Sequence, residues 1–237
     1  MVKISIVMPV YNDEKFIGDS IERAIEILDM MFEDYELIVV DDGSTDDTGK
    51  IIVRYDATIM PVLLCENRGK GAAFMAGVKR ATHEYVVMLD SDLQIEPYEL
   101  DPFFKLMNIY NADVVIGNKR HDYSITEYPP VRWLVSNTYN FMCRMLFGIR
   151  VRDTQCGLKL FKRSALLRVM PRLLVKRFAF DIELIVALQR KGIRIIDAPV
   201  NVMRRQNVGS VSWHNIVDTA RDTMAVWYRK KKGWYDV

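Results

Sequence analysis

The chain has 237 residues, half of them hydrophobic and 27% charged, which is enough to bury the core of one large domain. Its formal net charge of +2 is too small to favour nucleic acid as the main partner. Three cysteines (Cys65, Cys143 and Cys156) show no CxxC pair and no metal-ligand spacing with the three histidines. We therefore expect ordinary thiols in a reduced, cytoplasmic setting.

No apolar run approaches the ~20 residues that a membrane-spanning helix needs. The N-terminus leads from Met-Val-Lys directly into a strand pattern, so no signal peptide is evident. We expect a protein that is soluble or rests on a membrane surface.

The first 120 residues alternate between strand and helix patterns. Hydrophobic, β-branched runs predict strands at 3–8, 36–40, 59–64, 85–89 and 113–116. Apolar residues at helical spacing predict helices at 14–31 and 71–81, and Thr45 or Asp46 can cap a further helix that ends near Tyr55. This alternation predicts a Rossmann-like α/β fold, with a mainly parallel central sheet flanked by helices.

The second half is less regular. It predicts an irregular loop at 121–130, helices at 131–147, 179–189 and 216–228, and a strand at 194–202. The last helix leads into the basic run Arg229-Lys230-Lys231-Lys232. Because no repeat, low-complexity segment or linker is visible, we expect a single domain over residues 1–237.

Polar residues follow three of the predicted strands. In an open parallel sheet, ligands bind beyond the carboxyl ends of the strands. One such group alone could be ordinary loop chemistry, because Asp, Asn, Ser and Gly commonly end strands. Three groups at one rim instead predict a ligand site; they are Pro9, Tyr11, Asn12 and Glu14, then Asp41 and Asp42, then Asp90, Ser91, Asp92 and Gln94.

The Asp90-Ser91-Asp92 segment points most directly to chemistry. Two carboxylates two residues apart, at the end of a hydrophobic strand, can share a hard divalent cation that also binds diphosphate oxygens. Such a cation stabilises a diphosphate as a leaving group. An Asp-x-Asp sequence is common by chance and is weak evidence alone. The position of Asp90-Ser91-Asp92 directly after the predicted strand at 85–89 makes a metal site the better interpretation.

The glycine-rich segment 67–73 superficially suggests a phosphate-binding loop. It lacks the Gly-x4-Gly-Lys-Ser/Thr spacing, which argues against a P-loop NTPase. Two interpretations stay open: the glycines give a tight start to the following helix, or Arg68 or Lys70 lies near a bound donor.

At these residues the sequence resembles glycosyltransferase family 2, whose members are inverting enzymes of the GT-A fold. The similarity is ordered along the chain and spans most of the first 120 residues. It is carried by Ile4-Ser5-Ile6-Val7-Met8-Pro9-Val10-Tyr11-Asn12, Val39-Val40-Asp41-Asp42-Gly43-Ser44-Thr45-Asp46, Asn67-Arg68-Gly69-Lys70-Gly71 and Leu89-Asp90-Ser91-Asp92-Leu93-Gln94.

A narrower similarity points to the branch that loads mannose or glucose onto dolichyl or other polyprenyl phosphates. It is carried by the segments 153–161 (DTQCGLKLF) and 178–184 (FAFDIEL). The resemblance implies a nucleotide-sugar-binding half at 1–120 and an acceptor-side half at 121–237, which contains the basic, aromatic C-terminal helix. It also implies a GDP-mannose or UDP-glucose type of donor.

The resemblance implies a role for each site residue. Nucleoside contacts are expected from Pro9, Tyr11, Glu14 and Asp42, and metal ligation of Mg²⁺ or Mn²⁺ from Asp90, Asp92 and Gln94. Phosphate contacts are expected from the basic residues Lys119 or Arg120, Arg132, and Arg204 or Arg205. This chain departs from many relatives at Gly117-Asn118-Lys119-Arg120, where they have Gly-Ser-Arg, and at Val211, where they often have lysine.

The chemistry of the acceptor decides whether a catalytic base is needed. A phosphate monoester is largely a dianion at neutral pH, so it needs positioning more than deprotonation. A sugar hydroxyl needs a carboxylate base, and Asp181 and Glu183 are the candidates. Asp181 has an alternative role as a brace for the helix that begins there. We expect in-line attack at the anomeric carbon with Asp92 as an essential residue.

Aromatic and basic residues of the helix at 131–147 and of the C-terminal tail suit an interfacial position on the cytoplasmic face of a membrane with anionic lipid. A core or dimer helix, and a solvated basic end, are the alternatives; homodimerisation therefore stays open.

Three other functions compete: a nucleotidyltransferase, a transferase that acts on a saccharide hydroxyl, and a non-catalytic nucleotide-sugar-binding module. A nucleotidyltransferase would show a glycine-rich, basic signature after the first strand, where this chain has Pro-Val-Tyr-Asn.

Overall fold

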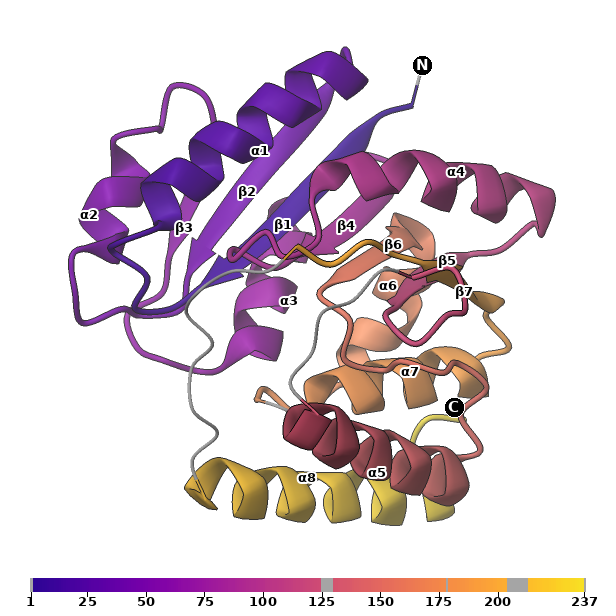
Figure 1. Ribbon diagram of the computed structural model, residues 1–237. Helices are drawn as coiled ribbons and strands as arrows, with labels where there is room; N and C mark the ends of the chain where they lie inside the picture. The colour runs from indigo at the N-terminus through magenta and orange to yellow at the C-terminus, as the bar shows by residue number, and fades with distance from the viewer. Residues whose placement is uncertain (1, 125–129, 178, 204–212, 237) are drawn as a thin grey trace.

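The computed structural model describes residues 2–124, 130–177, 179–203 and 213–236, and the side chains at 130–137 and 213–217 are outside this description. Within these ranges lie seven strands that form one sheet (Figure 1). They are β1 (Ile4–Val10), β2 (Tyr35–Asp41), β3 (Met60–Leu63), β4 (Tyr85–Leu89), β5 (Val114–Asn118), β6 (Leu158–Lys162) and β7 (Ile195–Pro199).

The strand order is β3-β2-β1-β4-β6-β5-β7. β1, β2, β3 and β4 pair in parallel, as do β5 and β7, whereas β6 runs antiparallel to both of its neighbours. The predicted α/β fold with a mainly parallel sheet is thus confirmed. β1 has no exposed residue, because both faces of a parallel sheet are covered by helices.

The helices cover both faces of the sheet. Figure 1 shows α1, α2 and α4 on one side and α3, α6 and α7 on the other, with α5 and α8 beyond α7. α7 contacts α3, α6 and α8, and α8 contacts α5. The helices are α1 (Ile17–Met31), α2 (Thr48–Val53), α3 (Lys70–Arg80), α4 (Leu100–Ile109), α5 (Pro130–Phe147), α6 (Arg163–Val169), α7 (Phe180–Arg190) and α8 (Trp213–Lys231), with short 3₁₀ turns η1 (Pro97–Glu99) and η2 (Met170–Arg172).

Three elements were not predicted from the sequence: α4, β6 and α6. β6 lies inside the segment that was used only for family similarity, and its five residues are too few to show a period. It separates β4 from β5, so the polar residues after β4 and those after β5 lie on either side of the chain that enters β6. No helix of the described residues is long and apolar enough to cross a membrane.

Candidate active site

A pocket of about 540 Å³ lies at the carboxyl ends of β1, β2 and β4. The three polar groups that the sequence places at one rim all contribute to it, because parallel strands bring their carboxyl ends to the same edge of the sheet. Its lining residues are Pro9, Val10, Tyr11, Asp42, Asn67, Gly69, Lys70, Asp90, Ser91, Asp92 and Arg177.

The start of α3 is tied to the end of β2 by Asp42. The two carboxylate oxygens of this buried residue accept the backbone N–H groups of Arg68 (2.9 Å) and Gly69 (2.7 Å). The N–H groups of Gly71 and Ala72 donate to the carbonyl of Lys176 at 2.8 and 3.3 Å. Since these donors are already used, the glycine-rich segment serves as a tight helix start and contributes the Lys70 side chain to the pocket.

Lys70 and Asp90 form an ion pair inside the pocket, with 2.5 Å between Nζ and Oδ1 and about a third of each side chain exposed. Burial acts to raise the pKa of Asp90, but the ammonium groups of Lys70, Lys159 and Lys119 outweigh it and hold that pKa below its ordinary value. The pKa of Lys70 is raised, because the charges of Asp90, Asp181 and Asp92 outweigh its burial. Both groups are therefore fully charged at neutral pH.

A second, much smaller space adjoins Asp90, Asp92 and Gln94, the three predicted metal ligands. Its volume of about 30 Å³ suits one water or one small ion, and Ile95, Lys119, Gly157 and Val202 complete its lining. A β-carbon at Gly157 would collide with the carboxylate of Asp90, so glycine is needed for β6 to begin this close.

These residues fit a divalent cation only in part. Within the described ranges, no group of three or more His, Cys, Asp or Glu residues is placed to hold a metal. Lys70 already neutralises Asp90, and Asp92 Oδ1 accepts the Gln94 backbone N–H at 3.2 Å. Mg²⁺ is nevertheless commonly held by one or two carboxylates, substrate phosphates and water, and Asp90 and Asp92 can supply that share.

Asp181 lies in the first turn of α7 and is almost fully buried. Its Oδ1 accepts a hydrogen bond from Lys159 Nζ at 2.7 Å, and the same fully buried ammonium donates to the carbonyl of Cys156 at 2.6 Å. An unpaired buried charge is costly, so each member of this pair stabilises the other in place. The carboxylate of Asp181 is thus engaged with a cation that no sequence pattern revealed.

Several predicted site residues do not line the pocket at the ends of β1, β2 and β4. Glu14 is exposed, and its carboxylate accepts the backbone N–H of Asp47 at the start of α2 (3.0 Å). Arg68 is exposed and pairs with Glu66 at 3.0 Å. Arg120 lies 3.2 Å from the buried carboxylate of Asp153. The side chain of Arg132, and Arg204 and Arg205 altogether, lie outside the described residues.

Two lining residues with polar or charged side chains, Asn67 and Arg177, were not predicted as site residues. Asn67 belongs to the glycine-rich segment 67–73, of which only Arg68 and Lys70 were named as candidates for donor binding. Arg177 comes from the loop before α7, more than eighty residues after Asp92 in the chain. This loop reaches the pocket because Lys176 receives the hydrogen bonds from the start of α3. Its sequence shows no feature that would have indicated this contact.

The family model described as glycosyl transferase family 2 matches residues 5–169. The chain belongs to this family. Among its curated relatives, the dolichyl-phosphate beta-glucosyltransferase of Dictyostelium discoideum is 26% identical over 100% of this chain and 77% of that protein. The protein of the same name from Homo sapiens is 32% identical over 84% of this chain and 67% of its own length.

Solved structures share the fold of this family 2 glycosyltransferase. Glucosyl-3-phosphoglycerate synthase from Mycobacterium tuberculosis, in complex with phosphoglyceric acid, aligns with a TM-score of 0.69 and 21% identity over 95% of this chain and 79% of that one. Another crystal structure of that synthase contains Mn²⁺, uridine-diphosphate and phosphoglyceric acid; it aligns with a TM-score of 0.69 and 20% identity over 95% of this chain and 77% of that one. At these identities the alignments establish a common fold.

Proposed function

We propose that this family 2 glycosyltransferase transfers a hexose, with inversion, from a nucleotide-diphosphate sugar to a polyprenyl phosphate. Two curated relatives that cover most of its length are named dolichyl-phosphate beta-glucosyltransferases, which favours glucose over mannose and a UDP-glucose type of donor. The pocket bordered by Tyr11, Asp42 and Lys70 is large enough for a nucleoside diphosphate.

In this proposal Asp90 and Asp92 hold Mg²⁺ or Mn²⁺ together with the donor's diphosphate, and Gln94 borders the site. The cation would supply charge neutralisation for the leaving diphosphate. Lys70 then exchanges partners: in the free enzyme it neutralises Asp90, and with donor bound its ammonium is released to a diphosphate oxygen. Arg177, which lines the same pocket beside Gly69, provides a further positive charge.

The Lys159–Asp181 ion pair is the observation that favours a phosphate acceptor. A general base needs a carboxylate oxygen that is free to take a proton. Asp181 instead shares its Oδ1 with a buried ammonium, and Glu183 is fully buried and holds the backbone N–H groups of Leu174 and Val175. A phosphate dianion requires no base and would be positioned by Lys119, which lines the small space beside Asp90 and Asp92.

A membrane surface is the expected place for such an acceptor. α5 and α8 lie side by side and expose apolar side chains: Phe141, Met142 and Met145 on α5, and Met224 and Tyr228 on α8. The tail beyond α8 is only partly available for lipid, because Tyr235 is buried and Trp234 donates to the carbonyl of Arg172. We propose that the exposed apolar side chains of these two helices rest on the cytoplasmic face of the membrane.

The proposal is tested by incubating the purified chain with labelled UDP-glucose or GDP-mannose, Mg²⁺ or Mn²⁺, and a polyprenyl phosphate. Label that partitions into organic solvent only when the polyprenyl phosphate is present is the expected result. Asp92→Ala should lower this transfer by at least a hundredfold while the melting temperature stays near that of the wild type. Transfer to a soluble saccharide instead, or full activity of Asp92→Ala, would contradict the proposal.

A further inference from the structure

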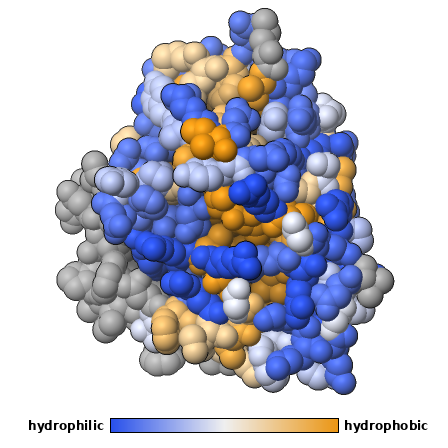
Figure 2. Space-filling model, turned by 90° about the vertical axis from the view of Figure 1, so that its right-hand side faces the viewer, coloured by the Kyte–Doolittle hydropathy of each residue, from blue (hydrophilic) through white to orange (hydrophobic). Residues whose placement is uncertain are grey.

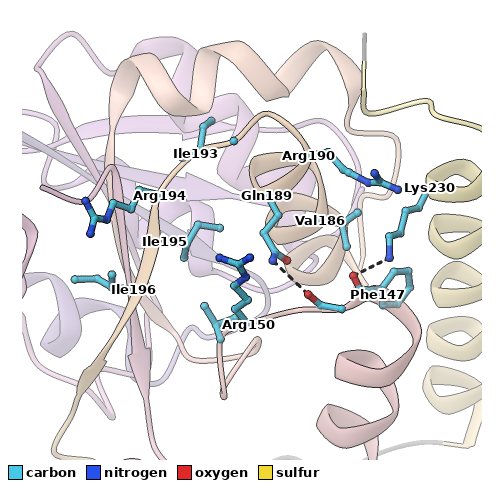
Figure 3. Close-up of a pocket in the computed structure, with 13 residues that line it drawn as sticks. Phe147, Arg150, Val186, Gln189, Arg190, Ile193, Arg194, Ile195, Ile196 and Lys230 are labelled. Atoms are coloured by element: carbon cyan, nitrogen blue, oxygen red, sulfur yellow. Dashed lines mark hydrogen bonds between the residues drawn. The ribbon is translucent and has the colours of Figure 1, made fainter. Parts of the chain in front are cut away.

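A second large cavity, of about 800 Å³, lies at the end of α7 that is remote from Asp181. The nine residues from Asp181 to Arg190 place it about 14 Å further along this helix. Figure 3 shows it between the end of α5, the last turns of α7 and α8, and the outer strand β7. Its apolar lining consists of Phe147, Val151, Val186, Ile193, Ile195 and Ile196.

The surface around this cavity combines an apolar area with hydrophilic side chains. On the face that lies to the right in Figure 1, Figure 2 shows a central apolar area crossed and bordered by hydrophilic side chains. β7 forms the outer edge of the sheet here, next to β5 alone. An apolar surface with a charged border suits a ligand that has both an apolar and an ionic part.

The described charged side chains that line the cavity are all positively charged. Of the residues that the structure describes, four cationic ones contribute (Arg150, Arg190, Arg194 and Lys230) and no acidic one does. Arg190 lies 3.5 Å from Asp236, whereas Arg150 and Arg194 have no ion-pair partner among the residues that the structure describes. In Figure 3 the guanidinium of Arg150 points toward the side chain of Gln189, and Arg190 points toward Lys230.

Lys230 lies near other cationic side chains and makes two contacts with uncharged groups of Phe147. Its Nζ donates to the carbonyl of Phe147 at 2.7 Å and lies 5.9 Å from the centre of that phenyl ring. Burial, with added repulsion from Arg190 and Lys231, lowers its pKa. An anion in the cavity would relieve this repulsion, and a second copy of the same face would increase it.

We propose that this cavity binds the phosphate headgroup and the adjoining apolar chain of an anionic phospholipid, at a site separate from the donor pocket. Arg150, Arg190 and Lys230 contact the phosphate, and Arg194 adds a further positive charge to the lining. The isoleucines of β7 contact the first part of the acyl chain. The neighbouring helices support this choice of ligand: the cavity lies at the ends of α5 and α8, which expose Phe141, Met142 and Met145 and Met224 and Tyr228.

The test measures binding of a water-soluble, short-chain phosphatidic acid to the whole chain by isothermal titration calorimetry. We expect saturable binding that Arg150→Gln/Arg194→Gln weakens at least tenfold. These two arginines have no described ion-pair partner, so their loss should leave the fold intact. Arg54→Gln/Arg80→Gln, which removes two charges from exposed positions elsewhere, is the matched control and should bind like the wild type.

Two further ligands distinguish the source of the anion. Phosphatidylcholine of the same chain length should bind at least tenfold more weakly, and inorganic phosphate should bind more weakly as well, because it lacks the apolar part. Equal binding of all three ligands, or equal binding by both double variants, would overturn the proposal. The assay involves no sugar transfer and no donor, so its outcome is independent of the proposed function.

Discussion

At the scale of single residues, the close approach of Gly157 to Asp90 decides the geometry of the candidate metal site. Asp90 lies at the end of β4, and the chain that enters β6 passes directly over its carboxylate. Any larger residue at 157 must displace either that carboxylate or the start of β6. The carboxylate of Asp90 can thus lie where it does only because residue 157 has no side chain.

Gly157→Ala is expected to lower transfer activity at least tenfold, because the new methyl group moves Asp90 away from Asp92. The matched control is Gly192→Ala, where a β-carbon meets no atom within 4 Å, although the positive φ of 68° makes this a strained position. Initial rates and melting temperatures of both variants check the prediction. A Gly157→Ala enzyme as active as the wild type would show that Asp90 need not stay where β6 holds it.

The charge of Asp90 gives a prediction about pH. Its pKa is lowered in the folded state, against an unfolded value of about 3.9. A depressed carboxyl pKa stabilises the fold above the unfolded pKa, and this contribution is lost as the pH falls through the folded pKa. The melting temperature of the wild type minus that of Asp90→Asn should therefore be constant from pH 8 to about 5. Below about pH 4 this difference should decrease, because the wild type loses the stabilising charge. A difference that changes mainly between pH 6 and 8 would contradict this assignment.

At the scale of elements, the buried pair Lys159–Asp181 joins β6 to α7. β6 is the antiparallel strand between β4 and β5, and α7 is the helix that also bears Glu183. Glu183 accepts hydrogen bonds from Arg229 (2.8 Å) and Tyr235 (2.7 Å), which attach α8 and the tail to the same helix. Two buried carboxylates of α7 therefore connect β6, α7, α8 and the C-terminal tail within the second half of the chain.

Removing one charge of the Lys159–Asp181 pair should lower the free energy of unfolding more than removing both charges. Lys159→Met leaves Asp181 buried without its cation, so we expect a loss of about 3–5 kcal/mol in the free energy of unfolding. Lys159→Met/Asp181→Leu replaces both charges by apolar groups and should recover most of that loss. Urea unfolding of Lys159→Met, of Asp181→Leu and of the double variant measures the coupling. Additive losses would mean that the two charges do not stabilise each other.

At the scale of the whole molecule, the exposed apolar side chains of α5 and α8 predict how the enzyme meets its acceptor. Phe141→Ser/Met145→Ser removes two side chains that are 66% and 72% exposed, so the fold should be preserved. Sedimentation with anionic vesicles should decrease at least fivefold, because apolar area no longer enters the interface. Ile109→Ser on α4, which is 74% exposed, is the control and should sediment like the wild type. Equal sedimentation of all three proteins would argue against this orientation.

How much the sequence predicts depends on whether a feature is local. The strands and helices of the first half follow from short-range periodicity, and the fold class follows from their alternation. β6 and α4 escaped prediction because the first is short and the second begins after a 3₁₀ turn rather than at a side-chain cap. The expected role of Arg120 shows another limit, since the buried carboxylate of Asp153 that lies beside it comes from a distant loop.

The sequence by itself determined the family, the α/β architecture and the rim where Asp42, Asp90 and Asp92 meet. It could do so because parallel strands necessarily bring their carboxyl ends to one edge. Only the tertiary structure decided which charges neutralise each other. Lys70 with Asp90, Lys159 with Asp181, and the cationic cavity beside β7 each combine residues that are far apart in the chain. Such long-range pairs leave no periodic trace in a sequence, because burial and distance fix them only after the chain has folded.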